Sequence, residues 1–413
     1  MTIEQERRLR YIDSDGHILE HPTAMPAYAP AEFRDRIWHV ETDDKGQEWV
    51  VFGEQRMPAN MTALAGTAGF TDEQVDAVRR GEVRYTECRP AAWDARLRLA
   101  DLDTDSIDLS VLYPTMLLGL QSLTDVPFAI AQARAYNDWC ADHIKEGQGR
   151  LFGAGALPPM HDADGVAAVA DEIRRVAQMP GMVSVFARPN PTVDWKPFHL
   201  HDYDPVWRAA DETGLPIAFH PFLAPDLPGA CLGMRLAEFG VGPGGEPMMA
   251  DADDPQYAAV RLANILFSQA IANPADVMAS IAYITAGGVC ERFPDAKFIF
   301  LEANGGWLVP WLERLDHHAE KFSWDVPWLK MKPSEYFRRQ CWISFDPDES
   351  MLAFTANSPL CGADRIIWAS DYPHPDAKFP GVTRELTEAL EGLSPEQQRQ
   401  ITSESARALY GIG

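Results

Sequence analysis

Five side chains that can bind a metal ion or move a proton each follow a short apolar run of the sequence. They are Asp15 and His17 in "DSDGH", His220 in "IAFHPF", Glu302 in "FLEANGGW" and Asp371 in "WASDYPHPD". Imidazole and carboxylate groups without a thiol are typical ligands of Zn, Mn or Fe. In an extended segment alternate side chains share a face, so Asp15 and His17 are expected to point at one object. The set predicts a divalent metal site, on the condition that the fold brings these runs together.

Eight short apolar runs predict the β-strands that must position these residues. Several of the runs, such as "SVLY" and "FIFL", are continuously apolar, which is typical of strands covered on both faces. Amphipathic helical patterns lie between most of them. The predicted strands span residues 9–13, 107–113, 151–157, 182–187, 216–220, 298–302, 342–345 and 366–369. Strands that alternate with helices in this number predict an α/β fold, a TIM-type (β/α)8 barrel.

An open, doubly wound sheet is the alternative arrangement of the same elements. No glycine-rich phosphate-binding fingerprint follows any of the predicted strands, which weakens the nucleotide-binding form of this alternative. In a closed parallel barrel the active site lies at the carboxyl ends of the strands. The barrel therefore predicts that all five metal-competent side chains lie on one rim.

Two connections between the predicted strands are much longer than ordinary barrel loops. Residues 18–106 separate the first strand from the second, and residues 222–296 separate the fifth from the sixth. Long insertions of this kind form lids or subunit contacts. The sequence shows no internal repeat, low-complexity tract or clear linker, so residues 1–413 are predicted to form one decorated barrel domain.

The charge and cysteine content restrict the partners and the compartment. The chain has 36 basic and 61 acidic residues, a formal charge of −25, which disfavours nucleic acid and anionic membranes as partners. The six cysteines are scattered without a Cys-x-x-Cys pair, as expected for reduced thiols in the cytoplasm. The opening "MTIEQERRLR" lacks the apolar core of a signal peptide, and no run is long enough for a bilayer span. We therefore expect a cytoplasmic protein with a small-molecule partner.

The motifs resemble the amidohydrolase-related family of metal-dependent hydrolases, in the branch that includes aminocarboxymuconate semialdehyde decarboxylase and the resorcylate decarboxylases. The resemblance covers nearly the whole chain, and "DSDGH" and "SDYPHPD" are its most specific motifs. Family members hold the metal with an H-x-H or E-x-H after strand one, a histidine after strand five and an aspartate after strand eight. The resemblance implies that Asp15, His17, His220 and Asp371 are ligands of one or two divalent ions, with Zn expected first and Mn or Fe as alternatives.

The stretch after the sixth predicted strand departs from the family pattern. Many members carry a histidine there that acts on water or substrate, whereas this chain has "EANGGW" with Glu302 at the strand end. Glu302 can act as a general base, as a ligand to the same or a second metal, or as a structural partner. Glu302 and Asp371 are the candidate catalytic residues.

Further polar and aromatic side chains follow the other predicted strands. Arg188 can pair with a substrate carboxylate, or can form an ordinary ion pair. Trp307 can line the substrate pocket, or can serve packing alone. Asp346 and His374 are expected to support the metal ligands by hydrogen bonds.

The function predicted first is metal-dependent hydrolysis or non-oxidative decarboxylation of a small organic substrate that bears a carboxylate. The alternative is an oxygen-dependent hydroxylase with a dinuclear Fe or Fe/Mn site on the same barrel, favoured by Glu302 and the missing histidine. A third possibility is a non-catalytic subunit with a structural metal. A homo-oligomer, or a pair with a related subunit, is expected.

Overall fold

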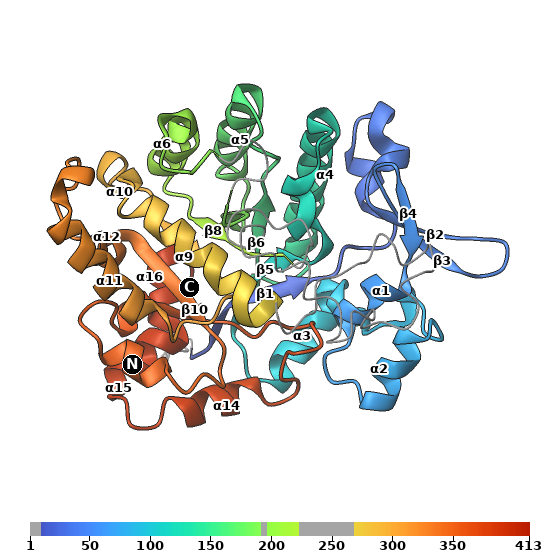
Figure 1. Cartoon of the computed structure of the whole chain (residues 1–413). Coiled ribbons are helices and arrows are strands. Elements are labelled where there is room, and N and C mark those ends of the chain that lie inside the picture. Colours follow the sequence, from blue (N-terminus) through green and yellow to red (C-terminus); the bar gives the residue numbers. More distant parts are fainter. Residues whose placement is uncertain (1–9, 191–195, 223–267) are drawn as a thin grey trace, which may run out of the picture.

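The computed structural model describes residues 10–190, 196–222 and 268–413, and contains an eight-stranded parallel sheet (Figure 1). The strands follow one another around the sheet in chain order. Their bounds are β1 Ile12–Ile18, β5 Leu109–Pro114, β6 Leu151–Ala156, β7 Met182–Ala187, β8 Ile217–Phe219, β9 Phe298–Phe300, β10 Cys341–Phe345 and β11 Ile366–Trp368. Each apolar run predicted as a strand is therefore confirmed as one.

Backbone hydrogen bonds close the sheet between β1 and the segment that follows β11. The Asp371 N–H donates to the Asp15 carbonyl at 3.1 Å, and the His17 N–H donates to the Tyr372 carbonyl at 2.7 Å. These bonds bring the first and last strands together, so the predicted barrel is confirmed and the open sheet is not observed. They also bring Asp371 next to Asp15 and His17, although Asp371 follows Asp15 by 356 residues in the chain.

The side chain of Asp13 stabilises the same junction between β1 and the segment after β11, which we call the seam. Its fully buried carboxylate accepts hydrogen bonds from the Ser110 hydroxyl on β5 and from the backbone N–H and hydroxyl of Ser370 after β11, at 2.7, 3.0 and 2.8 Å. Burial raises the pKa of Asp13, and the nearby Arg98 guanidinium opposes that rise. One carboxylate thus ties together three segments that lie far apart in the sequence.

The first strand extends further than the sequence indicated. The prediction placed its end at residue 13 and put Asp15 and His17 beyond it, whereas β1 runs through Ile18 and is buried throughout. Asp-Gly usually marks a turn. Here Gly16 lies within the strand. The position requires glycine because a Cβ atom would come 2.5 Å from the Asp13 Oδ2 atom. Asp15 and His17 are therefore strand residues.

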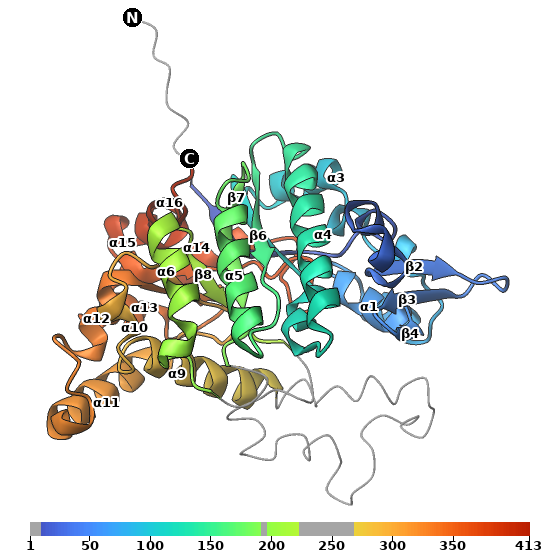
Figure 2. The ribbon, with the colours of Figure 1, turned by 90° about the horizontal axis from the view of Figure 1, so that it is seen from above.

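Amphipathic helices cover the outside of the barrel, and α4, α5 and α6 stand side by side in Figure 2. The buried stripe of α5 comprises Val166, Val169, Ile173 and Val176, as the helical spacing predicted. The helices that follow the barrel strands are α4 Val126–Lys145, α5 Ala163–Val176, α6 Asp204–Thr213, α9 Asn273–Ile284, α10 Val289–Arg292, α11 Leu308–Lys321, α12 Pro333–Gln340, α13 Leu352–Asn357, α14 Val382–Ala389, α15 Pro395–Arg399 and α16 Ser405–Tyr410.

The segment 274–293 contains two helices separated by a turn. Helix α9 ends at Ile284, and α10 begins at Val289 after a turn that contains Gly288. The backbone of Gly288 has a φ of +83°, a conformation that L-residues rarely adopt. The interruption is therefore local, and both helices remain between β8 and β9.

The first insertion forms a small substructure that projects from one side of the barrel (Figures 1 and 2). It contains an antiparallel three-stranded sheet and short helices. Its elements are β2 His39–Thr42, β3 Glu48–Phe52, β4 Gln55–Pro58, α1 Asn60–Ala63, α2 Asp72–Arg79 and α3 Ala95–Thr104. Much of the second predicted insertion, residues 223–267, lies outside the described residues. None of the helices within the described ranges combines the length and apolar character needed to cross a bilayer.

Candidate metal centre

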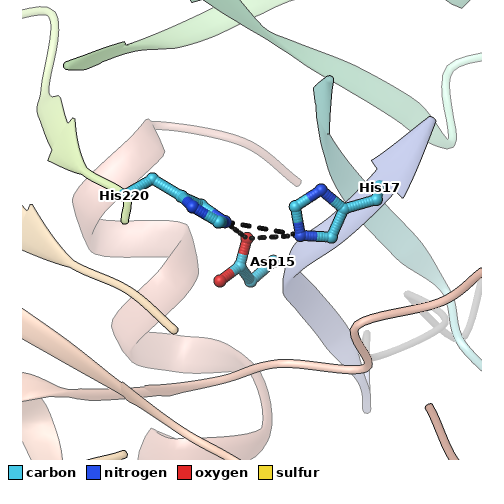
Figure 3. A group of neighbouring side chains, drawn as sticks. All are labelled: Asp15, His17 and His220. Carbon is cyan, nitrogen blue, oxygen red and sulfur yellow. Dashed lines mark hydrogen bonds and ion pairs between the residues drawn. The ribbon is translucent and has the colours of Figure 1, made fainter. Parts of the chain in front are cut away.

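Asp15, His17 and His220 converge inside the barrel (Figure 3). The Asp15 Oδ1 atom lies 3.7 Å from His17 Nε2 and 3.6 Å from His220 Nε2, and the two Nε2 atoms are 3.4 Å apart. All three side chains are buried. Ligand atoms ~2.1 Å from a tetrahedral ion are ~3.4 Å apart, so this spacing fits coordination of one metal.

Hydrogen bonding fixes which nitrogen of each imidazole can bind a metal. The Nδ1 atom of His17 lies 3.1 Å from the Pro114 carbonyl oxygen, and the Nδ1 atom of His220 lies 2.7 Å from the Pro221 carbonyl oxygen. A carbonyl only accepts hydrogen bonds, so Nδ1 carries the hydrogen in both neutral rings and Nε2 presents a lone pair. Burial lowers the pKa of His220 to about 4, which keeps its ring neutral.

The chemistry of the inner atoms fits a cation. Within the described residues, Asp15 Oδ1 is buried and receives no hydrogen bond. Burial raises the pKa of Asp15 to about 8. Once Asp15 is ionised, its Oδ1 atom and the Nε2 lone pairs of His17 and His220 are three acceptor atoms that face one another. Such atoms repel one another unless a positive charge lies among them. Carbonyl oxygens behind ligand histidines are typical of metal sites, so the residues fit a divalent ion.

Asp371, in the segment that follows β11, contacts this group from across the seam. Its Oδ1 atom lies 3.2 Å from His17 Nε2 and 3.1 Å from His374 Nδ1. Burial raises the pKa of Asp371, but the charges and hydrogen bonds of His374 and His17 outweigh burial and hold it below its ordinary value. Asp371 is therefore ionised, as a metal ligand must be.

Glu302 belongs to the same cluster, but its pKa is shifted in the direction opposite to that of Asp371. Its Oε2 atom lies 3.2 Å from His220 Nε2, and its Oε1 atom accepts a hydrogen bond from Gln269 at 3.1 Å. Burial, followed by the charges of Asp371 and Asp15, raises the pKa of Glu302 well above its ordinary value. Two neighbouring carboxyl groups whose pKa values are driven apart are typical of acid–base sites.

His374 lies against the metal-competent group, as its predicted supporting role requires. Its ring stacks on that of His17, with centroids 4.0 Å apart, and its Nε2 atom lies 3.1 Å from the Thr115 hydroxyl. Burial lowers the pKa of His374, but the charge and hydrogen bond of Asp371 outweigh burial and raise it. The structure thus brings His374 together with Asp15, His17, His220, Glu302 and Asp371.

Arg188 directly follows a barrel strand, and Trp307 directly precedes a helix. Arg188 directly follows β7, is buried, and donates a hydrogen bond from its guanidinium to the Ser122 hydroxyl. Trp307 is half-buried, precedes α11, and donates from its indole N–H to the Ala303 carbonyl at 2.7 Å. Their contact with a substrate stays a prediction.

The remaining predicted residue, Asp346, contacts the loop after β9. It accepts a hydrogen bond from the Asn304 amide at 2.8 Å, and its bonds in the described part of the chain do not include a histidine. Sequence reasoning missed Gln269 and Asn273, which bond each other and hold the side chain and carbonyl of Glu302. Both are neutral amides outside any motif, so only their position shows their connection to the site.

The model of the Amidohydrolase family matches residues 12–412, almost the whole chain. The chain belongs to this family. The match includes every residue placed in the cluster above and confirms the family predicted from the motifs. The protein is accordingly an enzyme of the amidohydrolase type.

Known proteins similar to this amidohydrolase-family chain include decarboxylases. A 2-amino-3-carboxymuconate-6-semialdehyde decarboxylase of Dictyostelium discoideum is 23% identical over 79% of this chain and 79% of its own length. The crystal structure of an amidohydrolase from Mycobacterium avium subsp. paratuberculosis K-10 has a TM-score of 0.69 and 20% identity, covering 98% of this chain and 100% of that one. A 5-carboxyvanillate decarboxylase of Novosphingobium aromaticivorans, complexed with manganese and 4-hydroxy-3-methoxy-5-nitrobenzoic acid, has a TM-score of 0.63 and 19% identity, covering 98% and 97%. These similarities confirm the predicted branch and barrel.

Proposed function

We propose that the protein is a metal-dependent, non-oxidative decarboxylase of a small aromatic or conjugated carboxylate. The observation that carries the proposal is the buried cluster of acceptor atoms of Asp15, His17, His220 and Asp371, with the Glu302 carboxyl group, whose pKa burial raises, beside it. The decarboxylases among the similar proteins support this reaction. The manganese in one of them supports Mn as the ion here, alongside Zn.

The reaction replaces a C–CO₂⁻ bond by a C–H bond and releases CO₂, so it consumes one proton and needs no oxidant. A divalent ion held by the four ligands would polarise a substrate oxygen and stabilise negative charge on the substrate. Glu302 supplies the proton to the carbon that loses CO₂, because its environment favours the protonated form. Gln269 holds the other carboxyl oxygen of Glu302, which fixes the direction of that transfer.

Substrate binding is assigned to the predicted residues on the same rim. Arg188 is the buried cation that pairs with a carboxylate of the substrate. Trp307 contributes an aromatic face to the ring of the substrate. The family match over residues 12–412 supports one domain for the whole chain.

Decarboxylation is favoured over the alternatives by the similar proteins named above. They are decarboxylases and an amidohydrolase, which supports the predicted carboxy-lyase chemistry over an oxygen-dependent hydroxylase. The acid–base contrast between Glu302 and Asp371 also argues against a purely structural metal.

The test is turnover of a panel of carboxylated phenols and of an aminocarboxymuconate semialdehyde by the manganese-loaded full chain in D₂O. We expect release of one CO₂ per product and one deuterium at the carbon that bore the carboxylate, measured by mass spectrometry. The matched control is His317→Ala, which removes an exposed histidine of α11. Oxygen consumption with a hydroxylated product, or no turnover of either substrate class, would contradict the proposal.

A further inference from the structure

A single buried guanidinium joins the two chain segments that meet at the seam. Arg98 lies on α3, in the first insertion, and only 2% of its surface is exposed. Its Nη1 atom donates to the His17 carbonyl at 3.0 Å, and its Nη2 atom donates to the Tyr372 carbonyl at 3.1 Å. His17 is itself a candidate ligand, and Tyr372 directly follows Asp371. Arg98 therefore bonds the backbone beside two candidate ligands on opposite sides of the seam.

The guanidinium reaches β1 at Gly16, between Asp15 and His17. A Cβ atom on Gly16 would lie 3.2 Å from Arg98 Nη2 and 2.5 Å from Asp13 Oδ2, both shorter than ordinary van der Waals contacts. Successive side chains of a strand point to opposite faces, so Arg98 lies on the face of β1 opposite to the ring of His17. The glycine between the two ligands of this strand thus leaves room for Arg98 to bond the backbone behind them.

Arg98 carries a full charge in the protein interior, because arginine is not deprotonated in proteins. Among the described residues, the hydrogen bonds of its guanidinium end on the two carbonyls and not on a carboxylate. Its Cζ atom lies 4.1 Å from the centroid of the Tyr372 ring, a favourable cation–π contact, and the charges of Asp13 and Asp101 act on it. A buried charge adds little to stability compared with an apolar side chain of similar volume. Stability alone therefore does not account for an arginine here.

Other residues of the first insertion hold the partner ring of Arg98. The Tyr372 hydroxyl is hydrogen-bonded to the Asp101 carboxylate and accepts from Arg89 Nε at 2.9 Å. Arg89 also pairs with Asp101 at 2.7 Å, and its Cζ atom lies 4.3 Å from the centroid of the Phe379 ring. These contacts fix α3 against the segment after β11. The first insertion is thus bonded directly to the backbone of the metal site.

The bond to the Tyr372 carbonyl lies next to a strained ligand. Asp371 has a φ angle of 54°, in the left-handed region that is unfavourable for a non-glycine residue. The Tyr372 carbonyl accepts from the His17 N–H at 2.7 Å and from Arg98, so both of its lone pairs are used. The two segments are therefore joined twice, directly and through the guanidinium. Across this junction His17 Nε2 and Asp371 Oδ1 lie 3.2 Å apart.

We propose that Arg98 is a positioning residue of the metal centre, which holds His17 and Asp371 at the separation that one ion needs. The inference rests on the metal centre of the proposed function, but not on the reaction performed there. The planar guanidinium bonds two carbonyls at once, whereas the ammonium of a lysine is a single point charge on a flexible chain. Arg98 acts only through the backbone of the ligands, so its loss should weaken metal binding without removing a ligand.

The experiment measures Mn²⁺ binding to the full chain without substrate. Arg98→Met removes the guanidinium, and Arg98→Lys keeps the positive charge but not the planar set of donors. We expect the dissociation constant of Mn²⁺, measured by electron paramagnetic resonance of the free ion, to rise ~10–100-fold in Arg98→Met and ~10-fold in Arg98→Lys. Arg96→Met is the matched control, because Arg96 lies on the same helix with 74% of its side chain exposed, and it should bind Mn²⁺ as the wild type does.

A second measurement separates ligand geometry from stability. The visible absorption spectrum of bound Co²⁺ depends on the arrangement of the ligands, so it should change in both Arg98 variants at a temperature where circular dichroism shows them folded. If Arg98→Met does not fold, Arg98→Lys decides the test, since it keeps the buried charge. The affinity and the cobalt spectrum of the wild type in Arg98→Lys, or the affinity of the wild type in Arg98→Met, would overturn the proposal.

The same measurements distinguish this proposal from the proposed function. Tight Mn²⁺ binding by the wild type without decarboxylation would refute the proposed function alone. Decarboxylation by the wild type, together with unchanged Mn²⁺ binding in the Arg98 variants, would refute the positioning role alone.

Discussion

The cluster has two halves that the fold builds in different ways. The strand-borne half lies on β1 and at the end of β8, and its side chains are at most 2% exposed. The loop-borne half follows β9 and β11, and its side chains are 12–18% exposed. The strand-borne half comprises Asp15, His17 and His220, and the loop-borne half comprises Glu302, Asp371 and His374. On the proposed function, we expect the strand-borne residues to fix the ion in the barrel and the loop-borne residues also to meet the substrate.

The backbone shows the same division. Glu302 and Asp371 have φ angles of 45° and 54°, the left-handed region that costs a non-glycine residue about 1–3 kcal/mol. Asp15 and His17 lie on β1, whose pairing with β5 shifts register between Asp13 and Gly16, and His220 continues the sheet by donating its N–H to the Ala187 carbonyl at 2.9 Å. Strain in the loop-borne half is maintained by contacts such as that of Asn273 with the Glu302 carbonyl. Strain held in this way is typical of functional positions.

The largest expected effect is the loss of metal on substitution in the strand-borne half. His220→Ala removes one buried ligand of the proposed metal site. Since the remaining ligands should hold the ion too weakly, we expect bound metal and decarboxylation to fall to background while the barrel stays folded. Elemental analysis and circular dichroism measure the two properties. His317→Ala, which removes an exposed histidine of α11, should change neither property. Full metal content in His220→Ala would remove the strand-borne half from the centre.

The loop-borne half should fail in a different way. Glu302→Gln keeps the shape of the side chain but removes its proton-donating carboxyl, so kcat should fall by ~10²–10⁴-fold with metal content unchanged. Steady-state kinetics on the manganese-loaded protein and elemental analysis check this outcome. If the variant instead loses metal, Glu302 is a ligand and the division between the halves is less sharp than proposed.

A third prediction addresses the seam that holds the halves together. Asp13→Ala removes one of the negative charges near the buried Arg98 and leaves the donors of Ser110 and Ser370 without an acceptor. We expect the free energy of unfolding to fall by ~3–5 kcal/mol. Urea titration measures the change, and Ser110→Ala, which removes one hydrogen bond, should lower it by only ~1 kcal/mol. Equal losses in both variants would mean that Asp13 does not tie the seam.

The smallest effect concerns Glu20, which lies just beyond the strand-borne half. It is fully buried and accepts a hydrogen bond from the Leu117 N–H at 2.9 Å, and burial raises its pKa from 4.5 to about 7. The folded state then binds more protons than the unfolded state between these values, so the free energy of unfolding falls as pH rises through this window. The loss approaches ~3 kcal/mol above pH 7.

Glu20→Gln tests this pH dependence because the amide stays neutral at every pH. Urea unfolding of the metal-free protein at pH 5 and pH 8 should show a gain of roughly 2–3 kcal/mol for the variant at pH 8 and little change at pH 5. Glu388→Gln, an exposed residue of α14, is the control and should follow the wild type. Parallel pH profiles for all three proteins would show that ionisation of Glu20 does not lower the free energy of unfolding.

Much of the site could be predicted because its residues stand beside strand signals. His220, Glu302 and Asp371 each follow a continuous apolar run, and those runs are β8, β9 and β11. The error lay at β1, where Asp and Gly residues indicated a turn although the chain stays extended to Ile18. Polar residues normally end a buried strand, but inside this barrel they pair with one another across the seam. No local pattern distinguishes these two cases.

The types of the ligands and the order of the strands were determined by the sequence alone, since the alternation of apolar runs and amphipathic segments depends on near neighbours in the chain. Only the tertiary structure decided which atoms face each other. The carbonyls of Pro114 and Pro221 leave Nε2 as the nitrogen of His17 and of His220 that can bind a metal, and the Thr115 hydroxyl lies against the Nε2 atom of His374. Apart from Pro221, which adjoins His220, these partners lie far away in the sequence. Hydrogen-bond direction and proton position depend on such distant atoms, so they arise only when the barrel closes.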